Sequence, residues 1–105
     1  MSSTYIIVRD AIFNKVQVIA DYDGYHREMC PHVIGTKNGR EQALFYQFAG
    51  ESRSGLGPPG SSDNWQCISI DGLTNVFIRR GPWHTAPTHS TTQTCIDDID
   101  IELRI

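Results

Sequence analysis

This 105-residue chain has no long apolar run and few cysteines. No segment approaches the roughly 20 apolar residues that a membrane-spanning helix needs, and the first residues, MSSTYIIVRD, lack the basic start and apolar run of a signal peptide. The three cysteines, Cys30, Cys67 and Cys95, are an odd number at wide spacing, which argues against a disulfide framework and agrees with a reducing compartment. Together these absences predict a soluble cytoplasmic protein.

An excess of positive charge is also absent, since nine Lys and Arg residues face twelve Asp and Glu residues for a net charge of −3. Residues 96–105 alone hold four acidic residues and one arginine, and the rest of the chain balances eight basic against eight acidic residues. Proteins that bind duplex DNA regardless of sequence need a basic excess, because phosphate contacts supply most of their affinity. A general duplex-DNA binder is therefore disfavoured, whereas a local cluster can still hold a nucleotide or a short single strand.

Hydrophobic periodicity predicts one helix followed by strands in a single domain over residues 1–105. Apolar residues recur every three to four positions over residues 6–14, which indicates a short helix capped by one of the hydroxyl residues at positions 2–4. From Val16 to Tyr22 apolar and polar residues alternate, which indicates a half-buried strand.

Four more strand-like segments follow, separated by turn signals such as Asp-Gly and Asn-Gly. They span residues 26–34, 42–49, 65–70 and 75–80. Pro31 lies in the first of them and cannot donate a ladder hydrogen bond, so we expect a bulge or a sheet edge there. Five strands and one helix joined by short turns predict a mainly β fold, a small barrel.

Two irregular segments and one amphipathic strand complete the expected organisation. Residues 50–64 are rich in Gly, Ser and Pro and predict a long flexible loop, and residues 81–95 predict an extended surface segment. In residues 96–105, apolar and acidic residues alternate as in a strand with one apolar face, which must be covered by the barrel or by a second subunit. That apolar face consists of Ile99, Ile101, Leu103 and Ile105.

The order of these elements resembles the WYL domain over roughly residues 6–80. The residues that carry the resemblance are a strand ending in Tyr22-Asp-Gly, Arg27 shortly before Pro31, the strand ALFYQ, and WQCISIDGL leading into NVFI. The resemblance implies an Sm-like or SH3-like barrel of about five strands, here with a short N-terminal helix and an extra C-terminal strand. The family usually carries this domain beside a DNA-binding helix-turn-helix.

The chain departs from the family pattern in two places. Leu44-Phe45-Tyr46 stands where the eponymous Trp-Tyr-Leu tripeptide is expected, and no helix-turn-helix segment precedes the first strand. We therefore expect a compact, standalone variant of the domain.

Arg27 is the first candidate site residue, because the resemblance implies that an arginine here lines the ligand site. A guanidinium presents a planar fork that matches phosphate or carboxylate. The alternative is a surface arginine paired with Asp21, Asp23 or Glu28, which contributes little to stability.

Three further residues complete the predicted ligand site. His32 and Tyr46 can donate hydrogen bonds, and Tyr46 can also stack on a base. The alternatives are a histidine that fixes the bulge and a core tyrosine with a satisfied hydroxyl. Arg53 lies between glycines that let backbone amides approach an anion, although a flexible solvated loop is the alternative.

Catalytic and metal-binding spacings are absent from the sequence. It contains no P-loop, no GxSxG and no CxxC or HxxxH pair. The cysteines and histidines considered as metal ligands are Cys30, His32, His84, His89 and Cys95. We expect no metal, no cofactor and no enzymatic activity, and we interpret the acidic residues near the C-terminus as a solvated strand face.

The sequence thus favours a ligand-binding regulatory module that senses a nucleotide, a short single-stranded nucleic acid or another anionic small molecule. The alternative is a non-catalytic interaction or assembly protein that pairs through its C-terminal strand, and a hydrolase or nuclease ranks third. No membrane partner is expected, and a homo-oligomer is compatible with the alternating C-terminal segment.

Overall fold

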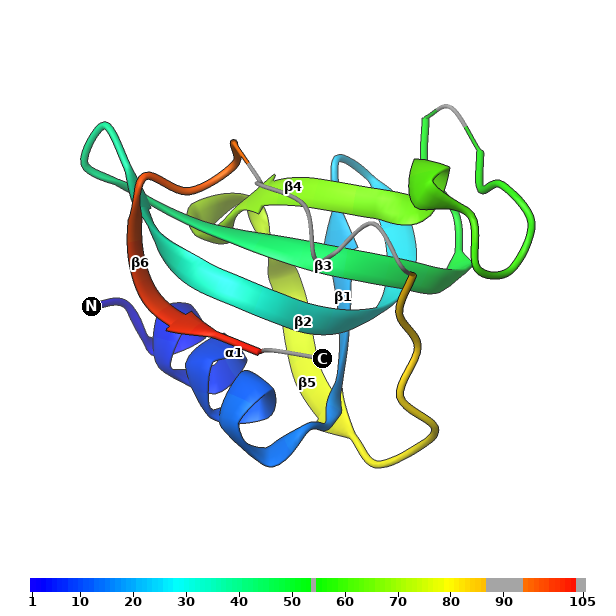
Figure 1. Cartoon of the computed structure of the whole chain (residues 1–105), viewed down its shortest axis with the longest axis horizontal. Helices are drawn as coiled ribbons and strands as arrows, with labels where there is room; N and C mark the ends of the chain where they lie inside the picture. The colour runs from blue at the N-terminus through cyan, green and yellow to red at the C-terminus, as the bar shows by residue number, and fades with distance from the viewer. Residues whose placement is uncertain (54, 87–93, 104–105) are drawn as a thin grey trace.

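The computed structural model describes residues 1–53, 55–86 and 94–103, and shows one α-helix and an antiparallel sheet (Figure 1). The predicted mainly β class is therefore confirmed. The elements are α1 (Ser3–Asn14), β1 (Gln17–Tyr22), β2 (Tyr25–Lys37), β3 (Arg40–Gly50), the 3₁₀ turn η1 (Ser62–Asn64), β4 (Trp65–Ser69), the 3₁₀ turn η2 (Ile70–Gly72), β5 (Thr74–Arg79) and β6 (Asp98–Glu102).

Helix α1 begins three residues before the predicted helix and is capped at both ends. The hydroxyl of Ser2 accepts a hydrogen bond from the Tyr5 N–H at 3.1 Å, which satisfies one of the free amides of the first turn. At the other end, Lys15 takes the left-handed conformation with φ 54° and closes the helix. Among the described residues, no helix has the length and apolar composition required to cross a membrane.

The described strands form a six-stranded sheet in which β4, β3, β2, β1 and β5 are neighbours in that order. The long strand β2 pairs with β3 on one edge, and on the other edge first with β1 and then with β6. In the described ranges, β4 and β5 at the two ends of this order do not pair with each other. The sheet is therefore open, and a closed barrel is not observed.

The bulge predicted around Pro31 is present. Pro31 is paired with Phe45 and Val33 with Leu44, so His32 is an extra residue on β2. Because an extra residue breaks the alternation of side chains between the two faces, the bulge changes the direction in which His32 points.

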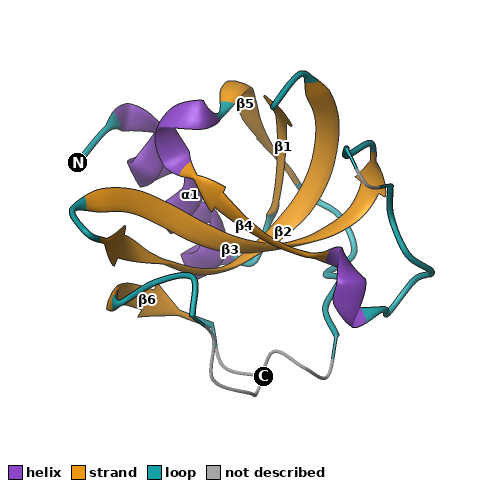
Figure 2. Cartoon of the chain, turned by 90° about the horizontal axis from the view of Figure 1, so that it is seen from above, coloured by secondary structure: helices purple, strands orange, loops and turns teal. Residues whose placement is uncertain are grey.

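The two faces of the sheet have different covers. Helix α1 lies against one face of the sheet, which we call the inner face (Figure 2). On that face Ala43 and Phe45 of β3 belong to the same core cluster as the apolar side of α1. Residues next to them along the strand must point the other way. On this outer face, Leu44 packs with Cys95 and Ile96, and further along the sheet residues 81–86 lie over it through contacts described below.

The expectation that the cysteines form no disulfide is wrong, because Cys67 on β4 is bonded to Cys95. The two residues are 28 positions apart, but their Cα atoms lie 5.7 Å apart because the chain before β6 passes over the outer face. The amide of Gln42 also donates a hydrogen bond to the Cys95 carbonyl at 2.7 Å. The cysteine count therefore gives no support to a reducing compartment.

The C-terminal strand forms as β6 and pairs with β2, from Val33 opposite Glu102 to Thr36 opposite Asp98. Its predicted apolar face is only partly covered. Ile101 and Leu103 pack against the core around α1, whereas Ile99 is 47% exposed, and Ile105 lies outside the described residues.

The acidic residues of β6 are not uniformly solvated either. Asp100 accepts a hydrogen bond from the Tyr5 hydroxyl at 2.7 Å and another from Arg9 Nε at 3.0 Å. These contacts join β6 to α1, and they lower the pKa of Asp100 below its usual value.

We predict that Tyr5 makes the protein sensitive to alkaline pH. Burial of Tyr5 and its hydrogen bond to Asp100 raise the pKa of its hydroxyl from 10.0 to about 12. The stabilisation is complete below pH 10 and is lost as the pH rises through 12, because only the unfolded state deprotonates in that interval. Urea unfolding from pH 8 to 12 should show a shallower loss of unfolding free energy in Tyr5→Phe than in the wild type; parallel curves would contradict this.

We predict that the disulfide contributes about 3–4 kcal/mol to stability, given the chain entropy removed by closing a loop of this length. The double substitution Cys67→Ser/Cys95→Ser should lose that amount in urea unfolding, and dithiothreitol should destabilise the wild type but not the variant. A thiol titration of unreduced, denatured protein should find Cys30 alone. Three reactive thiols in that titration would show that the bond is not formed.

Candidate functional site

Aromatic side chains surround a pocket on the outer face of the sheet, which we call the aromatic pocket. Its volume is about 440 Å³, within the range of small-molecule sites. One wall comes from strand β3, one from the loop between β3 and β4, and one from the segment after β5. The lining residues are Tyr46, Phe48, Gly57, Pro59, Gly60, Asn64, Trp83, His84 and Thr85.

Two of the lining rings are stacked on each other. The Phe48 and His84 rings lie 4.1 Å apart with an angle of 17° between their planes. The backbone N–H of His84 also donates to the buried Cys30 sulfur at 3.3 Å, which fixes this part of the segment on β2. The stack therefore presents aromatic surface from two separate parts of the chain.

Trp83, also in the lining, carries an unused hydrogen-bond donor. Its Nε1 is buried and finds no acceptor within the described part of the chain. A buried N–H without a partner costs about 1–3 kcal/mol. The Trp83 ring also has a cation beside it, because the ammonium of Lys15 lies 6.0 Å from its centre.

His32 joins the sheet to the segment after β5. Its Nδ1 lies 2.8 Å from the Cys30 carbonyl, which can only accept, so Nδ1 carries a proton. Its Nε2 lies 3.0 Å from the Thr85 hydroxyl, and its ring contacts the Trp65 and Trp83 rings at 4.8 and 5.1 Å. His32 is fully buried, so its main contribution is to hold Trp83 and Thr85 in place.

Tyr46 and Asn64 position the loop between β3 and β4. The Tyr46 hydroxyl donates to the Ser61 carbonyl at 3.0 Å, and its ring meets the edge of Trp65 at 5.0 Å. The Asn64 side chain accepts from the Gly57 N–H at 2.8 Å and donates back to the Gly57 carbonyl at 3.3 Å. Residues 57–64, the second half of the predicted loop, are thus held as a wall of the pocket.

Arg27 lies elsewhere, in the sheet interior, and is only 4% exposed. Its guanidinium donates to the Tyr22 carbonyl at 3.3 Å and to Gln47 Oε1 at 3.4 Å, and it lies 5.1 and 5.9 Å from the Tyr22 and Tyr25 rings. Burial lowers the pKa of Arg27, because removal from water disfavours the charged form. In this arrangement the guanidinium is neither open to an outside anion nor part of a surface ion pair.

Arg53 is also separate from the aromatic pocket. It is exposed, and its guanidinium pairs with the Asp23 carboxylate at 2.9 Å, a surface contact of small energetic value. Of the four predicted site residues, the structure brings His32 and Tyr46 together through Trp65. It places Arg27 and Arg53 near the turn between β1 and β2.

The residues considered as metal ligands do not assemble in the described ranges. Cys95 is in the disulfide, His89 lies outside the described residues, and no group of three or more His, Cys, Asp or Glu side chains is close enough to hold an ion there. Burial raises the pKa of the Cys30 thiol to about 11, so it stays protonated at neutral pH and is a poor nucleophile.

Sequence reasoning missed the pocket residues Phe48, Trp83 and His84, together with the neighbouring Trp65. Trp83 and His84 follow Pro82 in a segment without apolar periodicity, so no strand or helix pattern assigned them to a face. The available signal was composition, because both tryptophans of the chain lie in or next to the pocket.

No family model matches the chain, and comparisons with curated proteins and with solved structures find no match. The resemblance to the WYL domain therefore stays a prediction that depends on the motifs quoted from the sequence.

We predict that Arg27 is needed for packing of the interior. Arg27→Ala should lower the free energy of unfolding by about 2–3 kcal/mol, because it leaves a cavity and removes the donor to Gln47. Arg27→Met fills most of the volume but also removes the donor to Gln47, so it should lower the free energy of unfolding by less than Arg27→Ala does. Urea unfolding measures both, and equal stabilities of wild type and Arg27→Ala would contradict the buried position.

Proposed function

We propose that this protein is a non-catalytic regulatory module that binds a nucleotide or a short single-stranded nucleic acid, with a base in the aromatic pocket. The observation that carries the proposal is the pocket lining, in which Tyr46, Phe48, Trp83 and His84 supply aromatic surface around about 440 Å³. Stacking of a base on an aromatic side chain contributes about 1–3 kcal/mol and tolerates any base, because every base has a π face.

Two polar features support an anionic ligand with hydrogen-bond acceptors. A base carbonyl or ring nitrogen is a suitable acceptor for the unused N–H of Trp83. The Lys15 ammonium near the Trp83 ring provides a positive charge for a phosphate attached to that base. A single cation rather than a basic surface fits a small ligand and fits the net charge of −3.

We keep the small Sm-like or SH3-like barrel and the WYL-domain resemblance as parts of this proposal. What supports them is the sequential order of α1 and of strands β1 to β5, with β1 between β2 and β5. The cytoplasmic location stays a prediction, and the Cys67–Cys95 bond speaks for an oxidising compartment instead, because cytosolic thiols are kept reduced.

The alternative function, an interaction or assembly protein that pairs through its C-terminal strand, has one specific observation in its favour. Ile99 on β6 is a large aliphatic residue that is 47% exposed. Neither Ile99 nor any other β6 residue lines the aromatic pocket, so one chain can carry out both functions.

We predict that nucleoside monophosphates and a short oligonucleotide quench the tryptophan fluorescence, because Trp83 lines the site. Phe48→Ala should weaken their binding roughly 5- to 150-fold, the equivalent of one lost stacking contact. The matched control is Phe77→Ala, which removes an exposed ring on β5 outside the pocket and should leave affinity unchanged.

Two outcomes would overturn the proposed function. One is the absence of quenching by every nucleotide and oligonucleotide tested, and the other is equal affinity in Phe48→Ala and the wild type. Mass spectrometry of small molecules that co-purify with the protein gives an independent identification of the ligand class.

A further inference from the structure

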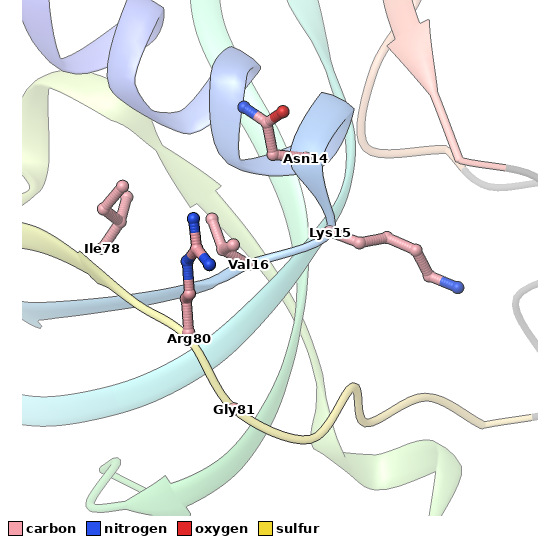
Figure 3. Close-up of a pocket in the computed structure, with 6 residues that line it drawn as sticks. All are labelled: Asn14, Lys15, Val16, Ile78, Arg80 and Gly81. Carbon is pink, nitrogen blue, oxygen red and sulfur yellow. The ribbon is translucent and has the colours of Figure 1, made fainter.

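A second hollow lies between the C-terminal end of α1 and strand β5, and we call it the α1–β5 groove (Figure 3). It has a volume of about 820 Å³ and is lined by Asn14, Lys15, Val16, Ile78, Arg80 and Gly81. Figure 3 shows Arg80 directed toward α1 between Ile78 and Val16, while Lys15 extends away from them. The groove therefore combines aliphatic surface with the positive charge of Arg80.

Exposed apolar side chains lie at the groove beside two cations that have no carboxylate partner in the described ranges. Ile78 is 55% exposed, and Phe13 just before the groove is 77% exposed. No acidic side chain in the described ranges pairs with Lys15 or Arg80. By contrast, three other arginines each pair with a carboxylate of the same chain, namely Arg9, Arg53 and Arg79.

The start of β6 has the complementary chemistry. Ile99 is exposed next to Asp98, which is also exposed. The Asp97 and Asp98 carboxylates meet no cation among residues 1–53, 55–86 and 94–103, whereas Asp100 is paired with Arg9. The start of β6 is thus acidic and aliphatic, whereas the α1–β5 groove is basic and aliphatic, so the two surfaces are complementary in charge.

The two surfaces cannot meet within one chain. Asp100 contacts Tyr5 near the start of α1, and the groove lies at its end, beside Lys15. Ten helical residues separate these positions, which corresponds to roughly 15 Å along the axis. Figure 1 shows β6 beginning beyond the N-terminal side of α1, with β5 and the end of α1 on the other side. A contact between the surfaces therefore needs two molecules.

We propose that the α1–β5 groove receives the Asp98–Ile99 end of β6 from a second copy of this chain. Ile99 packs on Val16 and Ile78, and the acidic residue beside it pairs with Arg80. The surfaces differ, so the contact is head to tail and produces a ring where the rotation closes or an open chain where it does not. This inference rests on the alternative assembly function and is independent of the aromatic pocket.

Charge reversal on each side of the contact gives a direct test. The wild-type mass, measured by light scattering on a sizing column, should rise with protein concentration and fall again with added salt. Arg80→Glu and Asp98→Arg should each weaken self-association at least about tenfold, because they place like charges together. Mixing the two variants should restore association, because the intact β6 of one meets the intact groove of the other.

A control variant and a second pair of variants distinguish loss of the contact from a general effect of charge change or misfolding. Arg40→Glu changes an exposed arginine outside both surfaces and should associate like the wild type. Ile78→Ser and Ile99→Ser change no charge and should also weaken association, with circular dichroism confirming the fold of every variant.

A wild type that stays monomeric at the highest concentration reached would overturn the proposal. So would an oligomer that persists in both single charge variants, or a mixture of them that does not associate. Arg80→Glu also separates the two proposals. It should lose self-association but keep the nucleotide quenching, because Arg80 does not line the aromatic pocket.

Discussion

The arrangement of the outer layer depends on His32, the extra residue in the β2 bulge. Its ring holds the segment after β5 through Thr85, and its carbonyl accepts a hydrogen bond from the Leu103 N–H at 2.7 Å. His32 thus holds both the segment after β5 and the end of the chain after β6. A regular strand would place this side chain in the alternating pattern of its neighbours, without the change of direction that the bulge provides. The position of Trp83 and Thr85 at the aromatic pocket follows from that local irregularity, and the same residue adds a backbone hydrogen bond at the end of the C-terminal strand.

The two layers of the protein are held by different kinds of interaction. The inner layer is ordinary hydrophobic packing of α1 on the sheet, in which many small contacts add up and no single polar group decides the position. The outer layer is narrower and depends on directional contacts, such as the His84 N–H to the Cys30 sulfur and the Tyr46 hydroxyl to the Ser61 carbonyl. A ligand pocket is better placed in the second kind of layer, because polar contacts fix the rings without filling the space between them.

Sequence reasoning succeeded where the physical cause is local. The cap at Ser2, the strand over residues 17–22 and the bulge at Pro31 each depend on neighbouring residues, and each is present. The expectation that this strand is half-buried is wrong, because Gln17 and Ile19 are buried along with Val18 and Ala20. Sequence reasoning failed where the cause is a long-range approach. The Cys67–Cys95 bond requires β4 and the chain before β6 to cross the same face, which spacing does not reveal. Arg27 is separated from His32 because its guanidinium is held in the interior by the Tyr22 carbonyl and Gln47 Oε1, contacts that the strand pattern does not reveal.

The disulfide also limits how copies of this chain can exchange segments. Cys95 lies three residues before β6, so the bond to β4 keeps this strand at an effective concentration in the millimolar range beside its own β2. If β6 detaches, it rebinds the same molecule far more readily than another one. Domain swapping of the C-terminal strand, a low-cost route to dimers, is therefore suppressed as long as the disulfide is intact. Reduction would remove that restraint and leave β6 free to pair with the β2 strand of a neighbour.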